Sequence, residues 1–415
     1  MPGNRTSSSS MWWLSSGEIK RARARVEKEA FAIRNATEDI VTPANAFETH
    51  AGQFWQVYST RAYMRARFEL AGPCLLATGT LDGVQQALEH LLDMLKLSRS
   101  DNMGLRDIIP AIMLRLDLDR ECHDFIRWWS VLDSPGDDLW ADSDAPYLIP
   151  SEASILSEPD FISERFPSLD HLNVLLLLEL RLVVDIRNLK VCRKVLAASK
   201  LPEHLWRTIE LATLRSPLSS LYQQLPPDDL TTAGEVHLEH AKKLGSQLHR
   251  ANSSFMFDLF DPDEALSSVV ETYSLGSWEE MALTLQNSYA AWSGSEGVLD
   301  LLGDACLCAE LDSEAEMEDM MDTDTFQSGE GRDRTIEELL EDVGVNRLWG
   351  YLEDAYADAY WLGPWCDRPS EQRRKEARRL WDEPDDDYFG YGMEDSDLED
   401  SDLEDGDLED GDFED

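Results

Sequence analysis

A pair of histidines is the first feature of the sequence that could support chemistry. His237 and His240 stand three residues apart in a segment with helical periodicity, and Glu239 lies between them. Residues three apart share one face of a helix, and two imidazoles on one face supply two of the ligands of a zinc site. No third ligand lies close by in the sequence. We therefore interpret the pair as ordinary exposed or half-buried histidines and expect no metal there.

The cysteines give little support for reactivity. Six of them in 415 residues do not make a disulfide framework, and Cys74, Cys122 and Cys192 each stand alone in an apolar helical segment. Cys306 and Cys308 form a close pair in acidic surroundings, which raise a thiol pKa and disfavour a reactive thiolate.

Other motifs of catalysis are missing from the sequence. It contains no phosphate loop, no G-x-G-x-x-G, no G-x-S-x-G and no H-E-x-x-H. The sequence thus predicts no catalytic, cofactor-binding or metal-binding residues, no cofactor and no enzymatic activity.

The C-terminal tail stands out by its charge. Residues 382–415 hold 19 acids and no Lys or Arg, and end in the repeats DSDLE, DSDLE, DGDLE and DGDFE. A period of five fits neither helix nor strand, and self-repulsion with low hydrophobicity favours disorder. The repeats lack the glycine that a calcium loop needs at its sixth position, while Ser396 and Ser401 match sites of acid-directed kinases. Just before the tail, residues 368–381 hold six Lys and Arg.

Composition excludes several classes of protein. The chain has 37 Lys and Arg against 83 Asp and Glu, a net charge of −46, while 42% of its residues are hydrophobic. That apolar content is too high for a fully disordered protein, and the charge disfavours binding to nucleic acids, whose phosphates require Lys and Arg. The N-terminus lacks the apolar core of a signal peptide, and three charges interrupt the longest apolar stretch, 172–186. We expect an intracellular protein, cytoplasmic or nuclear, that does not enter a membrane.

Helical periodicity dominates residues 54–132. Pro110 within the predicted helix 103–116 indicates a kink or a restarted helix, and Asp119 can cap the helix that follows. Ala87 and Cys122 are small residues 35 positions apart, close to the ~34-residue tetratricopeptide period, with chance spacing as the alternative. One apolar stripe at helical spacing marks residues 81–97; it consists of Leu81, Val84, Leu88, Leu91, Leu92 and Leu95.

The second half of the chain predicts a long central helix. Residues 174–178 are continuously apolar, which indicates a helix that is buried on every side. Two capping boxes, Ser277 with Glu280 and Thr335 with Glu338, mark the starts of further helices. The helices expected in this half cover 168–198, 203–214, 217–225, 235–251 and 278–292, with one starting after Thr335 and an aromatic one at 347–361.

These features predict an all-α protein whose helix pairs stack in a tetratricopeptide-like α-solenoid, a right-handed helical repeat. The acid-rich and Met-rich stretch after residue 303 is interpreted as a flexible insertion between helical regions. The regions expected along the chain are a disordered N-terminus (1–17), an N-terminal helical region with tetratricopeptide-like pairs (18–132), an acidic loop (133–166), a second helical region (167–303), an acidic linker (304–334), C-terminal helices ending in the basic segment (335–381) and a disordered acidic tail (382–415).

Two parts of the sequence resemble a known group of proteins. The first comprises FWQVYSTRAYMRARFELA and GTLDGVQQALEHLLDMLKLSRSDNMGLRDIIPAIMLRLDLDRECHDFIRWW, and the second KKLGSQLHRANSSFMFDLFDP and YSLGSWEEMALTLQNSYAAWSGSEGVLDLL. Both are similar to fungal proteins with a tetratricopeptide-like helical region, many of them described as MYND-finger proteins, and remotely similar to the tetratricopeptide-like suppression-of-tumorigenicity family. The resemblance implies a helical scaffold without a defined activity. A MYND finger needs clustered Cys and His with C-x-x-C spacing, which this chain lacks, so no zinc module is implied.

Two functions are consistent with these features. The first is a non-catalytic, intracellular module for protein–protein interaction, because stacked helix pairs present an extended concave face to partners. The alternative is an acidic, chaperone-like or nuclear, chromatin-associated factor whose tail binds basic proteins such as histones. Neither nucleic acid nor membrane is an expected partner. Binding that survives removal of the tail favours the first function, and binding that is lost with the tail favours the second.

Overall fold

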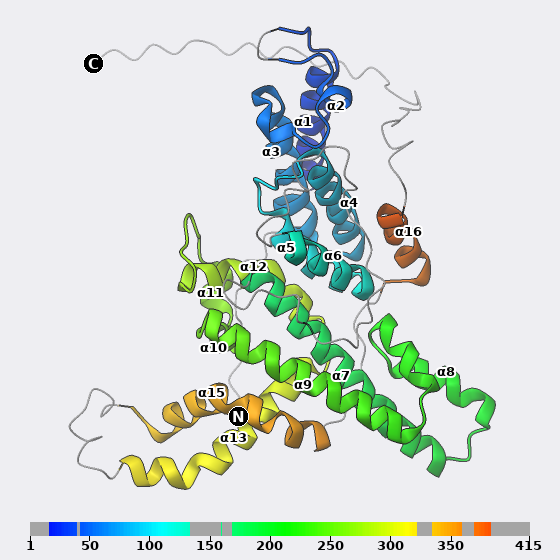
Figure 1. The fold of residues 1–415 in the computed structure, drawn as a ribbon, viewed down its shortest axis with the longest axis vertical. Coiled ribbons are helices and arrows are strands. Elements are labelled where there is room, and N and C mark those ends of the chain that lie inside the picture. Colours follow the sequence, from blue (N-terminus) through cyan, green and yellow to red (C-terminus); the bar gives the residue numbers. More distant parts are fainter. Residues whose placement is uncertain are drawn as a thin grey trace.

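The computed structural model describes residues 16–39, 42–132, 159, 168–321, 334–358 and 369–382. Every regular element in these ranges is a helix, and the remaining pairing is one isolated bridge between Gln53 and Ser98. The prediction of an all-α protein is therefore confirmed for this part of the chain. Figure 1 shows an elongated arrangement, with α1 to α4 at one end, α13 and α15 at the other, and α16 beside α4. Of the expected disordered ends, 1–17 and 382–415, all but residues 16, 17 and 382 lie outside the described residues, and these three belong to helices. Nearly all of the acidic loop also lies outside the described residues.

The N-terminal helices pack around the predicted apolar stripe. Thr80 caps α4, where its side chain accepts a hydrogen bond from the Gly83 N–H. Val84, Leu88 and Leu95 on this helix are fully buried. The elements of this part are α1 (Ser16–Arg34), α2 (Ala46–Thr49), η1 (Phe54–Gln56), η2 (Tyr58–Thr60), α3 (Arg61–Glu69), η3 (Leu70–Leu75), η4 (Leu76–Thr78), α4 (Leu81–Leu97), α5 (Leu105–Arg115) and α6 (Asp119–Leu132).

Helix α5 continues through Pro110 as one helix, so the prediction of a restart there is wrong. A proline at this position removes the N–H that would bond the carbonyl of Arg106, four residues earlier. The ring Nε2 of His171, on α7, lies 3.2 Å from that carbonyl oxygen and donates to it instead. A partner from another helix thus satisfies the group that the proline leaves free, which makes the proline tolerable inside the helix.

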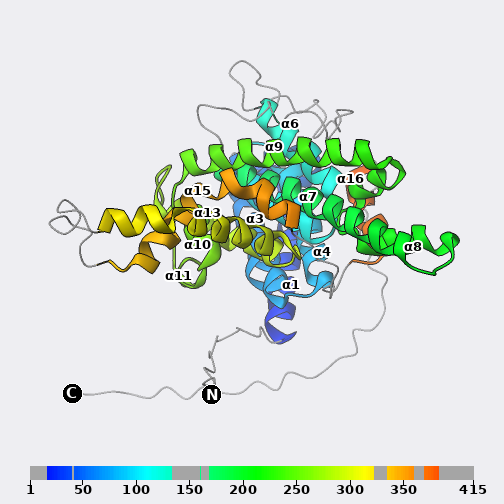
Figure 2. The same cartoon turned by 90° about the horizontal axis from the view of Figure 1, so that it is seen from below.

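A long central helix organises the second half of the molecule. Helix α7 packs along α9 and also contacts α5 and α12, and Figures 1 and 2 both show α7 and α9 running side by side. The Trp292 indole N–H donates to Asn173 Oδ1 at 3.1 Å, which ties α12 to α7 inside the core. The elements are α7 (Leu169–Ala198), α8 (Glu203–Thr213), η6 (Pro217–Gln224), α9 (Pro227–Ala251), α10 (Phe255–Phe260), α11 (Asp263–Ser267), α12 (Trp278–Ser293), α13 (Val298–Met321), α15 (Ile336–Asp358) and α16 (Glu371–Asp382).

Local capping by side chains accounts for the starts of two helices, α12 and α15. Ser277 accepts from the Glu280 N–H, which is one half of the predicted capping box, but the Glu280 carboxylate accepts from the Gly276 N–H in place of the Ser277 N–H. Thr335 and Glu338 make both hydrogen bonds of a capping box at the start of α15. Across the described ranges, no helix combines the length and the apolar character that crossing a membrane requires.

The expected acidic linker at 304–334 is wrong for residues 304–321, because α13 runs through them and packs against α15. Buried residues recur along α13 at helical spacing, while its acids lie mostly on the exposed side. Helix α15 is likewise one helix from Ile336 to Asp358, where the sequence predicted a separate aromatic helix from residue 347. In the sequence, the acidic composition of α13 obscured its buried face. That face includes Ala305, Cys306, Ala309, Ser313 and Met317.

The basic segment lies against the N-terminal helices. It forms α16, which contacts α4. Arg373 Nη1 lies 3.3 Å from Asp82 Oδ1, and Arg378 Nε lies 2.5 Å from Glu121 Oε1. Two of its cations are therefore already paired with carboxylates of the folded body.

Candidate functional site

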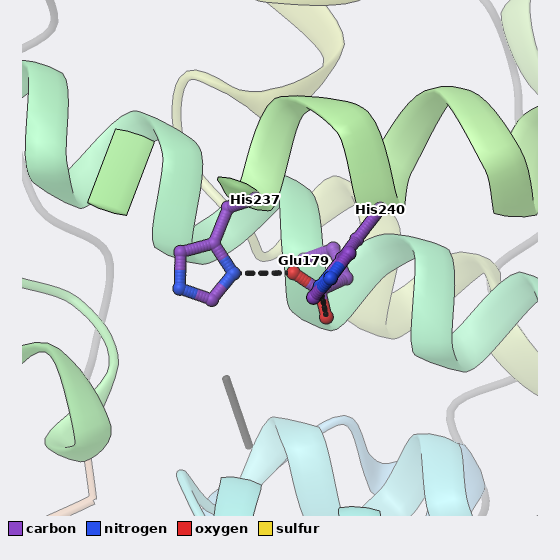
Figure 3. A group of neighbouring side chains, drawn as sticks. All are labelled: Glu179, His237 and His240. Carbon is purple, nitrogen blue, oxygen red and sulfur yellow. Dashed lines mark hydrogen bonds and ion pairs between the residues drawn. The ribbon is translucent and has the colours of Figure 1, made fainter. Parts of the chain in front are cut away.

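A buried glutamate joins the two histidines into one cluster (Figure 3). Glu179 lies on α7, and His237 and His240 lie on the face of α9 that packs against it. Nδ1 of His237 is 2.5 Å from Glu179 Oε2, and Nδ1 of His240 is 3.3 Å from Oε1. All three side chains are buried. The prediction of an exposed or half-buried pair is therefore wrong, and the sequence did not reveal the third member.

Tyr222 extends the cluster on its other side. Its hydroxyl, carried by η6, lies 2.5 Å from Nε2 of His237, so both ring nitrogens of this histidine are engaged. The carboxylate of Glu179 can only accept, so Nδ1–H of His237 donates to it, and in that tautomer Nε2 accepts from the Tyr222 hydroxyl. Burial, with the charge of Glu179, raises the pKa of Tyr222 well above its usual value, so the phenol stays protonated.

Glu179 carries a negative charge between the two rings. Burial by itself raises the pKa of a carboxyl group, but the hydrogen bonds from His237 and His240 outweigh it, and the pKa of Glu179 is lowered. The cluster offers one carboxylate oxygen and two imidazole nitrogens that lie within 4.8 Å of one another. Such an arrangement can hold a metal ion or share protons along the chain Tyr222–His237–Glu179.

A second polar network supports this cluster from the opposite side of α7. Arg181 Nη2 donates to Asp117 Oδ1 at 2.9 Å, and Nη1 lies 3.1 Å from Asp119 Oδ1, so α7 is fixed to the turn between α5 and α6. Asp185 accepts the backbone N–H groups of Arg215 and Ser216, each at 2.7 Å.

Asp185 therefore fixes the start of η6, the element that carries Tyr222, and burial raises the pKa of Asp185 to about 6. Each of the three charges that interrupt the apolar run of α7 thus has partners on another element. A charge inside the most apolar stretch of a sequence is the signal that could have revealed such partners, because it must be paired when buried.

The remaining candidates of the sequence do not converge on a site. Burial and the nearby Glu310 raise the pKa of Cys306 to about 12, which keeps its thiol protonated, and Cys308 is partly exposed. Among the described residues, no other group of three His, Cys, Asp or Glu side chains converges as the Glu179 cluster does. Ser396, Ser401 and the acidic repeats lie outside these residues.

Five large apolar side chains are exposed within residues 260–275, here called the 260–275 segment. Its backbone is held against α12, where Gln286 Nε2 donates to the carbonyls of Ala265 and Ser268 at 2.8 and 3.0 Å. Its acids are exposed as well, and the sequence has no Lys or Arg between Arg250 and Arg332. The large apolar side chains that face solvent are Phe260, Leu266, Val269 (89% exposed), Tyr273 and Leu275 (72% exposed).

Comparison of the chain with family models, with curated proteins and with solved structures found no match to any of them. The resemblance to tetratricopeptide-like proteins therefore rests on the quoted sequence strings alone. The side chains of the cluster and of the 260–275 segment are the remaining guides to function.

Proposed function

We propose that this chain is a non-catalytic, intracellular protein-interaction module and that its 260–275 segment docks a basic, amphipathic segment of a partner protein. The observation that carries this proposal is the concentration of exposed apolar side chains in sixteen consecutive residues. Exposed apolar surface has a cost in water, and where it is gathered and rimmed by polar residues it is typical of protein interfaces. The firmly held backbone favours a pre-organised surface.

The charges of the segment select the chemistry of the partner. Asp261, Asp263, Glu264 and Glu271 are exposed among the apolar side chains, and no base balances them within the segment. A partner with apolar anchors flanked by Lys or Arg complements this surface in both respects. The net charge of −46 also steers basic partners toward the chain over long range.

The scaffold proposed for this surface is a stack of tetratricopeptide-like helix pairs. Supporting it, α4, α5 and α6 contact one another in chain order, and α13 packs against α15. Stacked pairs bury a shared core and leave side chains at their edges for binding. The alternative function, an acidic chaperone-like or chromatin-associated factor, assigns the binding of basic proteins to the tail at 382–415 instead.

A peptide-binding experiment distinguishes these possibilities. The probe is a labelled amphipathic peptide of Leu and Arg, and its counterpart with Glu in place of every Arg is the charge control. We expect the basic peptide alone to bind, and the double variant Val269→Ser/Leu275→Ser to weaken binding at least about tenfold, or ~1.4 kcal/mol. The matched control is Leu307→Ser/Leu311→Ser, which changes two exposed apolar residues of α13.

Each outcome assigns the binding site. Equal affinity in the two double variants would contradict the role of the 260–275 segment. Binding that disappears when 383–415 are deleted, but not in Val269→Ser/Leu275→Ser, supports the acidic-tail function. Failure of the basic peptide to bind the full chain at low salt argues against both.

A further inference from the structure

We infer that Glu179, His237 and His240 form a binding site for a divalent transition-metal ion, with Zn²⁺ as the expected occupant. This inference is independent of the proposed function. It rests on three buried ligand atoms, one oxygen and two nitrogens, that two different helices bring within 4.8 Å of one another. Figure 3 shows both imidazoles turned toward the carboxylate.

The ligand set selects the kind of metal. Two imidazoles with one carboxylate are a set that zinc enzymes use, whereas Ca²⁺ and Mg²⁺ prefer oxygen ligands. Tetrahedral zinc places its ligand atoms ~3.4 Å apart, since its bonds to nitrogen and oxygen are ~2.0–2.2 Å long. The pair of His240 Nδ1 and Glu179 Oε1 is already at 3.3 Å, and the pair of His237 Nδ1 and Glu179 Oε2 must widen from 2.5 Å. The two contacts use different oxygens of the carboxylate, so binding would draw one oxygen and the two nitrogens, now within 4.8 Å of one another, to about 3.4 Å.

The protons of the cluster can rearrange without a net loss. Without metal, a ring in its Nδ1–H tautomer donates to Glu179, whose carboxylate can only accept. When the Nδ1 lone pair binds the ion, the ring proton resides on Nε2, so the ring changes tautomer and no proton leaves the protein. Nε2 of His237 then becomes a donor.

Tyr222 is suited to both states of His237. A hydroxyl can donate or accept, so Tyr222 donates to Nε2 in the metal-free ring and accepts from Nε2–H in the metal-bound ring, with the 2.5 Å contact kept. Metal-bound histidines almost always donate a hydrogen bond from the N–H of their second ring nitrogen to a fixed partner. Asp185, which fixes the start of η6, holds that partner in place.

The access side and the fourth ligand follow from burial. The side chain of His237 is fully buried, whereas those of His240 and Glu179 are about a tenth exposed, at 10% and 9%. The ion therefore enters beside His240, and a water on that side completes the tetrahedron. A bound ion links α7 to α9 and stabilises the fold, because it binds the folded chain and not the unfolded one.

Metal titration of the full chain tests the site. The chain is stripped with a chelator and titrated with Zn²⁺, and with Co²⁺ as an optical probe, in millimolar Ca²⁺ that occupies the many exposed carboxylates. We expect one tight site, an intense visible d–d spectrum from tetrahedral Co²⁺, and a higher thermal midpoint with Zn²⁺. His240→Gln and the isosteric Tyr222→Phe should each weaken Zn²⁺ binding about 10–100-fold.

The matched control is His249→Gln, an exposed histidine of the same helix, which should bind Zn²⁺ as the parent chain does. Absence of the tetrahedral Co²⁺ spectrum in the parent chain would overturn the inference, whatever the variants do. So would equal affinities of His240→Gln, Tyr222→Phe and His249→Gln. The cluster would then be a hydrogen-bonded core contact.

Discussion

Arg181→Met should destabilise the fold strongly, because it removes the cation that lies nearest to two buried carboxylates. Arg181 is 2% exposed, and its guanidinium contacts Asp117 and Asp119 at 2.9 and 3.1 Å. It also donates to the Leu114 carbonyl at 3.0 Å. Methionine has a similar length and fills most of the space, so the loss reports on charge rather than on a cavity.

The expected loss is ~3–5 kcal/mol at neutral pH, the usual cost of removing one partner of a buried ion pair. Whole domains are stable by only ~5–15 kcal/mol, so this loss is about a fifth of the total or more. Burial raises the pKa of Asp119 to about 6, although the charge of Arg181 lowers it. Without Arg181 the pKa of Asp119 rises further.

The sign of the pH dependence follows from that shift. A carboxyl whose pKa is raised in the folded state binds its proton more tightly there, so folding is not penalised below the unfolded pKa of ~3.9. The penalty grows as the pH rises toward the folded pKa. In the parent chain the penalty stops growing near pH 6, the folded pKa of Asp119. In Arg181→Met the penalty continues to grow above that pH, because the folded pKa is higher. The difference in stability should therefore be smaller at about pH 5 than at about pH 8.

Urea unfolding of both chains at these two pH values measures the effect, with Arg207→Met, an exposed arginine of α8, as the control. Adding Asp119→Asn to Arg181→Met should recover part of the loss, because one stranded charge is removed. A change within ~0.5 kcal/mol, as for a surface substitution, would refute the burial argument. An equal loss at both pH values would refute its electrostatic part.

Three further predictions concern packing and the tail. Leu88→Ala should cost ~2–5 kcal/mol in chemical denaturation, since the side chain is fully buried. Gly245→Ala should cost ~1–3 kcal/mol, because the new methyl would lie 2.3 Å from the Trp349 ring. The control Gly303→Ala meets no atom within 4 Å and should be neutral or stabilising. Similar denaturation midpoints for the two variants would contradict this prediction. Deleting 383–415 should leave the thermal midpoint of the helical body unchanged, since the acidic repeats predict no packed element, and a drop of many degrees would show otherwise.

Local signals in the sequence were sufficient for many elements. The stripe from Val84 to Leu95 and the capping residues Ser277 and Thr335 act within one or two turns of a helix, and the structure has helices where they predicted them. Composition was a poorer guide in α13. Its acids suggested a linker, yet Glu, Ala, Leu and Met are strong helix formers, and one face of small and apolar residues is enough to pack against α15.

The cluster could not be predicted in the same way. Glu179 and His237 are 58 positions apart, and no local spacing relates two helices that meet only in the folded core. The sequence did show that Glu179, Arg181 and Asp185 interrupt an apolar run, and that buried charges need partners. It did not show which residues the partners are, because that depends on how α7 is rotated against α5, η6 and α9.

These three charged residues of α7 determine how this helix is rotated about its axis. At about 100° per residue, Arg181 and Asp185 point roughly 200° and 240° away from Glu179, so they face the opposite side of the helix. The contacts agree, since Glu179 meets α9 while Arg181 and Asp185 meet the α5–α6 turn and the start of η6. The run of leucines beside them is apolar all round and would pack almost equally well in several rotations. Leaving any of these three groups unpaired is costly, so the rotation that satisfies all of them is strongly favoured, and that same rotation brings Glu179 between His237 and His240.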